Sequence, residues 1–326
     1  MKIEDIGEFE LIEIIRNTIG ETPNLLLGIG DDACAWTFHA GIHLATTDSL
    51  VEGVHFNPKF ARWYDLGYKA LAVNLSDIAA MGGLGSIALV SLALPGDIQV
   101  EDIVSFYQGM LELARESEVS IGGGNISRSP LISITVSLIG TGSVAGMLKR
   151  SGARKGDLVA ITGFPGSAAA GRTVLYNPCT PDGEYTTPLV QSFIKPVPRL
   201  AQGHVLKNEG ASSAIDISDG LLADLGHLLT ASGLGATIDV DKLPLEPLIK
   251  SGFSLKQAAE LALSGGEDYE LLFTASKNAM KNIAKEIGVQ MSIIGRITEA
   301  PPGHIELTGE NASLVNLNTA GWKHFG

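Results

Sequence analysis

Apolar residues recur along the chain with two different periods, which together predict a mixed α/β protein. Helical spacing predicts amphipathic helices over residues 8–19, 62–81 and 100–118. Alternating or continuous apolar runs predict strands over residues 33–38, 42–47, 86–94 and 131–140. From the first strand onward the order is therefore β, β, α, β, α, β. This order indicates a helix-covered sheet whose other face is also buried, against a second copy of the chain.

A second α/β region follows. A strand over residues 157–162 leads into a helix over residues 166–176, and a strand over residues 213–217 turns into another amphipathic helix. Because 326 residues exceed one ordinary core, we expect two domains. The boundary lies at about Leu148, which gives residues 1–147 and 148–326.

Composition limits the classes of function. Hydrophobic residues make up 45% of the chain, yet no apolar run reaches the roughly 18 residues that a membrane span needs. The first residues are acidic and mixed, and Cys34 and Cys179 lie far apart, so we expect a protein of the reducing cytoplasm without membrane association. A net charge of −13 argues against nucleic acid as a partner, but not against nucleotides bound through a metal.

Three carboxylates begin the candidate chemistry. Asp31, Asp32 and Asp48 lie at the mouths of the first two predicted strands, where they would converge on one end of a sheet. Crowded carboxylates repel one another, and a divalent cation neutralises them well. The stretch therefore predicts half of a magnesium site, although a turn at Asp31-Asp32 and a cap at Asp48 are the plain alternatives.

Two further polar positions follow this stretch. Asn74 and Asp77 are three residues apart in a predicted helix, hence on one face, among Ala and Leu residues. Buried polar groups need partners, which favours a ligand-binding face over a helix surface. His55 follows an acidic turn closely enough to face the same site, but a lone histidine is more often structural.

The glycine-rich stretch Ile121 to Pro130 predicts a loop that a ligand can approach closely, with Asn125 among its polar groups. Glycine runs also mark ordinary turns. The basic stretch Leu148 to Asp157 contains Arg150 and reads as a solvated linker, although arginine also suits a polyphosphate.

The second domain contributes two acidic motifs. Asp216 and Asp219 flank the turn at Ser218-Asp219-Gly220, where Asp219 could be a simple helix cap, whereas Asp216 lies inside an apolar strand. Glu267 and its acidic neighbours lie between two glycines and a predicted strand. Ser264 and Glu267 have the spacing of a capping box, but strand-like residues follow, which disfavours a helix start.

Several common chemistries are absent from the sequence. There is no GxxxxGK[ST] loop, no HExxH and no evident Cys/His or Ser/His/acid arrangement. The GxGxxA match at Gly28 would put two aspartates where a dinucleotide pyrophosphate rests. What remains fits metal-dependent phosphate chemistry.

Motifs over the whole chain extend this reading. They are GIGDDACA, TTDSLVEGVHF, YKALAVNLSDIAAMGG, RSGARKGD, AIDISDGLLADLGH and LSGGEDYELLF. In this order and spacing the chain resembles the thiamine-monophosphate kinases, whose superfamily includes aminoimidazole ribonucleotide synthase and selenophosphate synthetase. The resemblance implies phosphorylation of thiamine monophosphate by ATP with several Mg²⁺ ions. It also implies an aminoimidazole ribonucleotide synthase-like fold, with a ferredoxin-like N-terminal sheet that forms a homodimer interface, a C-terminal α/β domain and an active site in the cleft.

The resemblance also assigns roles to individual residues. Those implied for the magnesium shell are Asp32, Thr46, Thr47, Asp48, Asp77, Asn125, Asp216 and Asp219, of which Asp48, Asp77 and Asp216 are the expected catalytic residues. Those implied for ATP are Gly124, Asn125, Arg150 and Ser218. Those implied for thiamine monophosphate are His55, Glu267 and Trp322.

One departure from the family pattern affects the metal. The glycine stretch commonly ends in GGD, whereas here it reads Gly123-Gly124-Asn125, so one ligand charge is missing. Two alternatives to the kinase stay open: a sister ATP-dependent synthetase that activates an amide or carbonyl oxygen, and a non-catalytic nucleotide-binding module. The GGEDYEL stretch with Trp322 favours the kinase over the synthetase, and the retained acidic residues favour it over the module.

Overall fold

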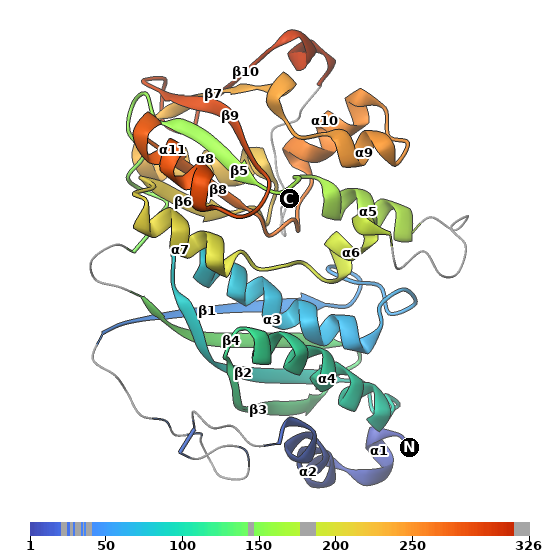
Figure 1. The fold of residues 1–326 in the computed structure, drawn as a ribbon. Helices are drawn as coiled ribbons and strands as arrows, with labels where there is room; N and C mark the ends of the chain where they lie inside the picture. Colours follow the sequence, from blue (N-terminus) through green and yellow to red (C-terminus); the bar gives the residue numbers. More distant parts are fainter. Residues whose placement is uncertain are drawn as a thin grey trace. The chain divides into compact units, whose positions relative to one another are not determined.

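A computed structural model of the protein describes residues 1–20, 25–26, 29, 34, 36, 41–142, 147–176 and 187–315. The chain divides into two compact units, Met1–Ile78 with Leu84–Val144 and Ala79–Gly83 with Ala145–Gly326. Each unit combines one β-sheet with helices, as the alternating pattern predicts (Figure 1). The α/β fold expected from the sequence is therefore confirmed.

The first unit is built on a four-stranded sheet. Its elements are α1 (Ile3–Ile6), α2 (Glu8–Ile19), β1 (Ile42–Val51), α3 (Trp63–Ala80), β2 (Leu84–Leu94), α4 (Val100–Glu116), β3 (Ser120–Arg128) and β4 (Ser133–Gly142). The strand order is β1-β4-β2-β3, with β2 and β3 parallel and the other pairs antiparallel. Strands β1 and β3 are therefore the two edges of the sheet.

Side chains alternate between the two faces of this sheet. In β4, Ile134, Val136 and Leu138 are buried beneath helices α3 and α4, which lie on one face (Figure 1). Thr135 and Ser137 alternate with them and belong to the opposite face. This polar and apolar alternation is the pattern of a sheet that has one helix-covered face.

The predicted helices and strands of this unit are largely confirmed, with one correction. The loop expected over Ile121 to Pro130 is wrong, because most of it is strand β3. Gly124 pairs with Val90 so closely that a Cβ at Gly124 would lie 1.7 Å from the Val90 carbonyl oxygen. The glycines thus allow close strand pairing rather than a turn. The strand predicted over residues 33–38 falls largely outside the described residues.

The second unit contains a six-stranded sheet. Its strands are β5 (Leu158–Thr162), β6 (Ser213–Asp216), β7 (Gly235–Asp239), β8 (Leu271–Ala275), β9 (Met291–Thr298) and β10 (Ile305–Thr308). Its α-helices are α5 (Ser167–Leu175), α6 (Pro188–Ile194), α7 (Leu200–Asn208), α8 (Leu221–Ser232), α9 (Glu246–Lys250), α10 (Leu255–Ser264) and α11 (Lys277–Glu286). Two 3₁₀ helices, η2 (Val240–Lys242) and η3 (Glu310–Leu314), complete the described elements.

Both faces of this second sheet are buried. The strand order is β10-β7-β9-β5-β8-β6, and in β5 the side chains of Val159 and Ile161 join one hydrophobic cluster while Ala160 joins another. Helices α8 and α10 contribute to the first cluster, and α7 and α11 contribute to the second. The central strands are accordingly apolar throughout, which is why their sequences run apolar rather than alternate.

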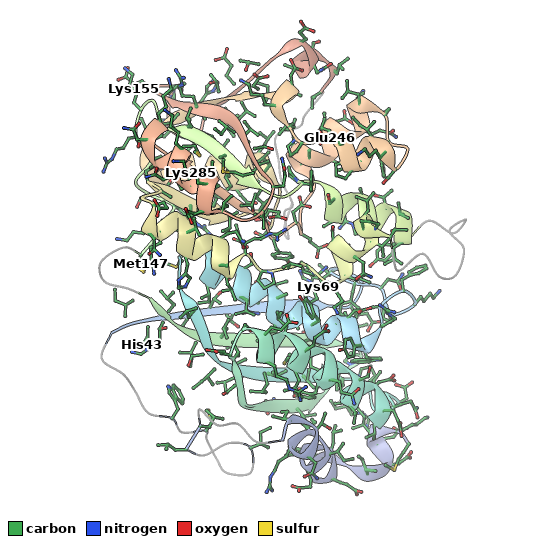
Figure 2. All side chains as sticks on the ribbon, viewed as in Figure 1. His43, Lys69, Met147, Lys155, Glu246 and Lys285 are labelled. Carbon is green, nitrogen blue, oxygen red and sulfur yellow. The ribbon has the colours of Figure 1, made fainter. Side chains whose placement is uncertain are left out.

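Charged side chains such as Lys155, Glu246 and Lys285 lie on the outside of this unit, where water solvates them (Figure 2). Among the described residues, no helix combines the length and the apolar character that crossing a membrane would require.

Candidate functional site

Strand β1 and helix α3 bring three of the predicted metal-binding residues together. Thr46 and Asp48 are two residues apart in β1, so their side chains share one face of the sheet. The Thr46 hydroxyl donates a hydrogen bond to the Asp77 carboxylate on α3, which shows that this is the helix-covered face. Thr46 and Asp77 are therefore in contact, and Asp48 lies on the same face of β1 as Thr46.

Thr47 does not join this group through its side chain. It lies on the opposite face, where its hydroxyl donates to the Val136 carbonyl oxygen at 3.1 Å and lies 3.0 Å from the Ser137 hydroxyl. The alternation of the strand excludes the Thr47 hydroxyl from the ligand set that contains Asp77.

Gly124 and Asn125 lie far from Asp48 within the same sheet. The register aligns Asp48 with Val136, Val136 with Val90, and Val90 with Gly124, so three strand spacings separate Asp48 from Gly124. At about 4.8 Å for each spacing, the distance is roughly 14 Å. Asn125 also pairs with Ser91, on the face opposite Asp48. Within one chain, Asp48 and Asn125 cannot bind the same magnesium ion, whose bonds to oxygen are only about 2.1 Å long.

His55 and Asn74 have definite partners in the first unit. The His55 ring accepts a hydrogen bond at Nδ1 from the Val51 backbone N–H, which holds the ring against the end of β1. Asn74 is fully buried, and its Nδ2 donates to the Ala70 carbonyl oxygen. Its Oδ1 has no hydrogen-bond partner among the described residues. A buried acceptor of this kind costs about 1–3 kcal/mol unless something pairs with it.

The turn after strand β6 carries three predicted ligands in the second unit. Asp216 ends β6 with only 4% of its surface exposed, while Ser218 and Asp219 are partly exposed. One carboxylate oxygen of Asp224, in the first turn of helix α8, accepts hydrogen bonds from the N–H groups of Ser218, Asp219 and Gly220, at 3.0, 3.1 and 3.1 Å. The turn that presents Ser218 and Asp219 is thus fixed through its backbone.

Burial and a neighbouring carboxylate both act on Asp224. Burial and the negative charge of Asp219 raise the pKa of Asp224 to about 7, although the three N–H groups act in the opposite direction. The partly exposed Asp219 carboxylate and the buried Asp224 carboxylate repel each other. A cation bound at Asp219 would reduce that repulsion.

Arg150 lies beside the same strand. The carbonyl oxygen of Lys149 accepts from the Ala214 N–H of β6 at 3.0 Å, and the Arg150 carbonyl oxygen accepts from the Ser232 hydroxyl at the end of α8. The Arg150 side chain itself is exposed. Arg150 and Asp216 therefore belong to neighbouring segments of one unit, as a common phosphate site requires.

Glu267 lies in the connection between helix α10 and strand β8. Its N–H donates to the Ser218 carbonyl oxygen at 2.7 Å, and the Tyr269 N–H donates to the Ile217 carbonyl oxygen at 2.8 Å. Ser264 ends α10 rather than beginning a helix, so the capping box is absent, as expected. The motif that carries Glu267 is thus hydrogen-bonded to the turn that carries Ser218.

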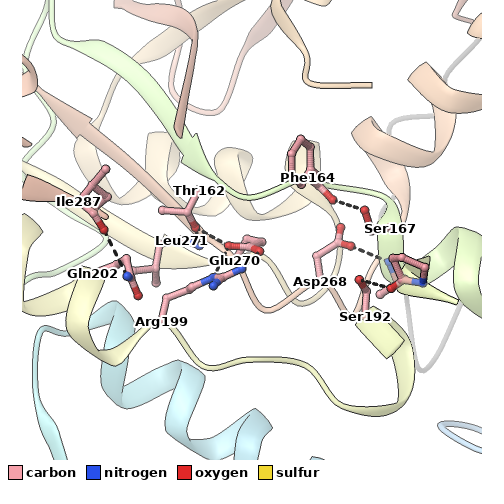
Figure 3. Close-up of polar contacts among 12 residues, drawn as sticks. Thr162, Phe164, Ser167, Ser192, Arg199, Gln202, Asp268, Glu270, Leu271 and Ile287 are labelled. Carbon is pink, nitrogen blue, oxygen red and sulfur yellow. Dashed lines mark hydrogen bonds and ion pairs between the residues drawn. The ribbon is translucent and has the colours of Figure 1, made fainter. Parts of the chain in front are cut away.

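The two other acidic residues of this connection point into the domain (Figure 3). Asp268 accepts from the N–H groups of Gly166 at 2.6 Å and Ala168 at 3.0 Å, at the start of helix α5. Glu270 forms a two-pronged ion pair with Arg199, with Nε at 2.7 Å, and accepts from the Thr162 hydroxyl at 2.6 Å. Asp268 and Glu270 therefore serve the structure of the segment.

The backbone of this segment is unusual. Among the described residues, three that are not glycine have a positive φ, and two of them are Glu267 at 68° and Tyr269 at 53°. The left-handed region costs such residues roughly 1–2 kcal/mol each, so the surrounding contacts must hold them there.

Three predicted residues, Asp31, Asp32 and Trp322, lie outside the described residues. Within the described part of the chain, no three His, Cys, Asp or Glu side chains cluster in a way that could hold a metal ion. The described donors are nevertheless carboxylate and hydroxyl oxygens, which are the ligands that Mg²⁺ prefers.

Comparison with known proteins agrees with this layout. The family models for the AIR synthase related protein match residues 30–144 with the N-terminal domain and residues 154–307 with the C-terminal domain. Thiamine-monophosphate kinase from Escherichia coli K12 is 38% identical over 325 residues, which cover 98% of each chain. The chain belongs to the thiamine-monophosphate kinase family.

Solved structures support the family assignment. The crystal structure of thiamine-monophosphate kinase from Stenotrophomonas maltophilia K279a has 35% identity and a TM-score of 0.82, and the match covers 95% of this chain and 98% of that one. A structure of AaThiL complexed with AMPPCP and TMP has 34% identity and a TM-score of 0.77, and the match covers 100% of this chain and 99% of that one. The aminoimidazole ribonucleotide synthase-like fold expected from the motifs is therefore confirmed.

Sequence reasoning missed the residues that support the family's motifs in this chain. The apolar spacing includes Asp224 only as one position of an amphipathic helix, and no local pattern assigns a role to Asp268 or Arg199. One signal was present for Asp224, because it is a lone acidic residue in the apolar run LLADLGHLL. Arg199 gave no such signal, since its partner Glu270 is 71 residues away.

Proposed function

We propose that this protein transfers the γ-phosphoryl group of ATP to thiamine monophosphate and so forms thiamine diphosphate. The observation that carries the proposal is the match of both domains, at 38% identity, to a protein named thiamine-monophosphate kinase. The related AaThiL structure contains AMPPCP, an ATP analogue, together with TMP.

The oxygen donors of the site fit Mg²⁺ by their chemistry. In the first unit, Thr46, Asp48 and Asp77 would bind Mg²⁺, and in the second unit Asp216 and Asp219 would do so. Bound Mg²⁺ would neutralise the charge that develops on the phosphates during transfer. Asp32 and Asn125 complete the proposed set.

The remaining residues bind and orient the two substrates. Ser218, Arg150 and the Gly124-Asn125 pair contact ATP, and His55, Glu267 and Trp322 contact thiamine monophosphate. The acceptor is a phosphate group with a second pKa near 6, so it is largely ionised at pH 7. The reaction therefore needs no general base, and the chain has only to bring two polyanions together in line.

We also propose that the protein is a homodimer. We place it in the cytoplasm, which the cysteine usage favours. Asp48 and Asn125 lie at opposite edges of one sheet and on opposite faces, yet both are proposed to serve the phosphates. A second copy packed on the face that carries Thr135, Ser137 and Asn125, with its β3 edge over the β1 edge of the first copy, would bring Asn125 of one chain toward the edge strand that carries Asp48 of the other.

Complementation tests the dimer. Asp48→Asn and Asn125→Ala should each be inactive alone, and a mixture should regain activity after subunit exchange, because one site of each mixed dimer contains neither substitution. Light scattering should give twice the chain mass. A monomer, an active Asn125→Ala variant or a mixture without recovery would contradict the proposal.

The function itself is tested by incubating the purified protein with ATP, Mg²⁺ and thiamine monophosphate. Equal amounts of ADP and thiamine diphosphate are expected, and omission of Mg²⁺ should stop both. Thiamine and adenosine monophosphate serve as control acceptors. ADP formation that does not depend on thiamine monophosphate would favour a sister synthetase, and nucleotide binding without turnover would favour a binding module.

A further inference from the structure

The connection from Gly265 to Glu270 sends its acidic side chains in two directions. Asp268 and Glu270 are buried, whereas Glu267 is only partly buried. The two inward carboxylates hold the segment from inside the domain, while the backbone N–H of Glu267 is bonded to the Ser218 carbonyl oxygen. The Glu267 side chain is thus attached to a backbone that is held by its own N–H and by the carboxylates that follow it.

Asp268 is the anchor next to Glu267 in the chain. Its two carboxylate oxygens accept from two different N–H groups, Oδ2 from Gly166 and Oδ1 from Ala168. Only a carboxylate of this size offers two acceptors at this place, and the start of helix α5 favours a negative charge there. The residues on either side of Asp268, Glu267 and Tyr269, have positive φ values. If the segment lost its contacts, these residues would relax to negative φ values.

We propose that Asp268 is a positioning residue that sets the affinity for thiamine monophosphate by fixing the direction of Glu267. This inference rests on the proposed function, in which Glu267 contacts that substrate. Asp268 acts through the backbone of Glu267 and does not touch the substrate itself.

A substitution at Asp268 should leave Ser218, the proposed ATP contact, in place. Ser218 is held by the carboxylate of Asp224, which also accepts from the N–H groups of Asp219 and Gly220. Loss of the bond from the Glu267 N–H therefore leaves the turn at Ser218 with its own support. A change at Asp268 should separate the KM for thiamine monophosphate from the KM for ATP.

The test is Asp268→Asn in the full chain, assayed at pH 9, because burial raises the pKa of Asp268 to about 8 and both of its oxygens can accept only in the ionised form. The asparagine keeps the shape, but its NH₂ group faces an N–H donor, so one of the two bonds is lost. The KM for thiamine monophosphate should rise about tenfold, and the KM for ATP should change less than about twofold. Asp157→Asn is the matched control, because Asp157 is also a buried carboxylate that accepts from a backbone N–H, that of Arg154, and from the Ser212 hydroxyl. That control should lower Tm without separating the two KM values.

A double-mutant cycle tests whether Asp268 acts through Glu267. If Asp268 acts through Glu267, Asp268→Asn should add little to the KM of Glu267→Gln, whereas independent effects would multiply. Multiplied effects, or a rise of both KM values alike, would overturn the proposal. If Asp268→Asn does not fold, Arg199→Lys loosens the other anchor, at Glu270, and must give the same separation. An inactive wild-type protein would refute the proposed function, whereas an active one without the separation would refute only the role of Asp268.

Discussion

In the first unit, Thr46 and Asp48 project from a strand and Asp77 from a helix, whereas in the second unit Ser218, Asp219 and Glu267 lie in connections between elements. Strand pairing and helix packing already fix the backbone of the first group. The second group needs further contacts, and buried carboxylates supply them: Asp224 for the turn and Asp268 for the segment of Glu267.

This difference separates two kinds of acidic residue. Carboxylates on regular elements can be devoted to ligands, because the core of the domain carries the stability. Carboxylates that hold connections accept backbone N–H groups, and they connect the shape of the site to the stability of the domain. Substitution of a ligand carboxylate on a helix or strand should therefore lower activity alone. Substitution of a carboxylate that holds a connection should lower activity and stability together.

The largest effect is expected from Asp48→Asn and Asp77→Asn. Each removes a proposed metal charge and keeps the packing, so kcat should fall at least about a hundredfold while Tm stays within about 2 °C. Steady-state kinetics and thermal unfolding check this prediction, with Asp97→Asn, an exposed aspartate of the same unit, as the control. A kcat close to that of the wild type at ordinary Mg²⁺ concentration would remove that residue from the site.

Asp224→Asn should affect activity and stability together. The substitution replaces the carboxylate that accepts three N–H groups with a weaker, neutral acceptor. At this buried site the free energy of unfolding should fall by about 1–3 kcal/mol and Tm by several degrees. The turn then loosens, and kcat should fall about tenfold. A lower kcat with an unchanged Tm would show that Asp224 acts on the substrates directly, and the distinction between the two groups would fail.

The buried anchors also predict how stability depends on pH. Burial raises the pKa of Asp268 to about 8, so the folded chain keeps a proton that the unfolded chain releases near pH 4. Raising the pH from about 4 to about 8 therefore favours unfolding, and this contribution to stability falls across that range. Thermal unfolding of the metal-free protein should show a shallower decline for Asp268→Asn than for the wild type. An equal or steeper decline would contradict this account.

The smallest effect is expected at the edge strand β3. Asn125→Asp would restore a charged oxygen next to the phosphates, so the Mg²⁺ concentration that gives half-maximal activity should fall about threefold, with Tm almost unchanged. Asn282→Asp, at an exposed position of helix α11, supplies a control in which the same charge is added elsewhere. An unchanged or weaker response to Mg²⁺ would show that Asn125 is not a ligand.

The sequence by itself determined the helices and strands with strong periodicity, and it identified the motifs that place the chain in its family. Helix α2 begins and ends where the apolar spacing predicts, and the turn at Ser218-Asp219-Gly220 precedes helix α8 as expected. Both features depend on residues close together in the chain, so local patterns contain the necessary information.

Only the tertiary structure decided which residues meet. The glycine stretch is a strand because Val90, far away in sequence, pairs with Gly124, and the same pairing separates Asn125 from Asp48. Thr47 turns away from Asp77 because of the register of β1 with β4. Asp268 became an anchor because helix α5 begins beside it, about a hundred residues earlier in the chain. Register and burial arise from contacts between distant segments, and the period of a single segment does not contain them.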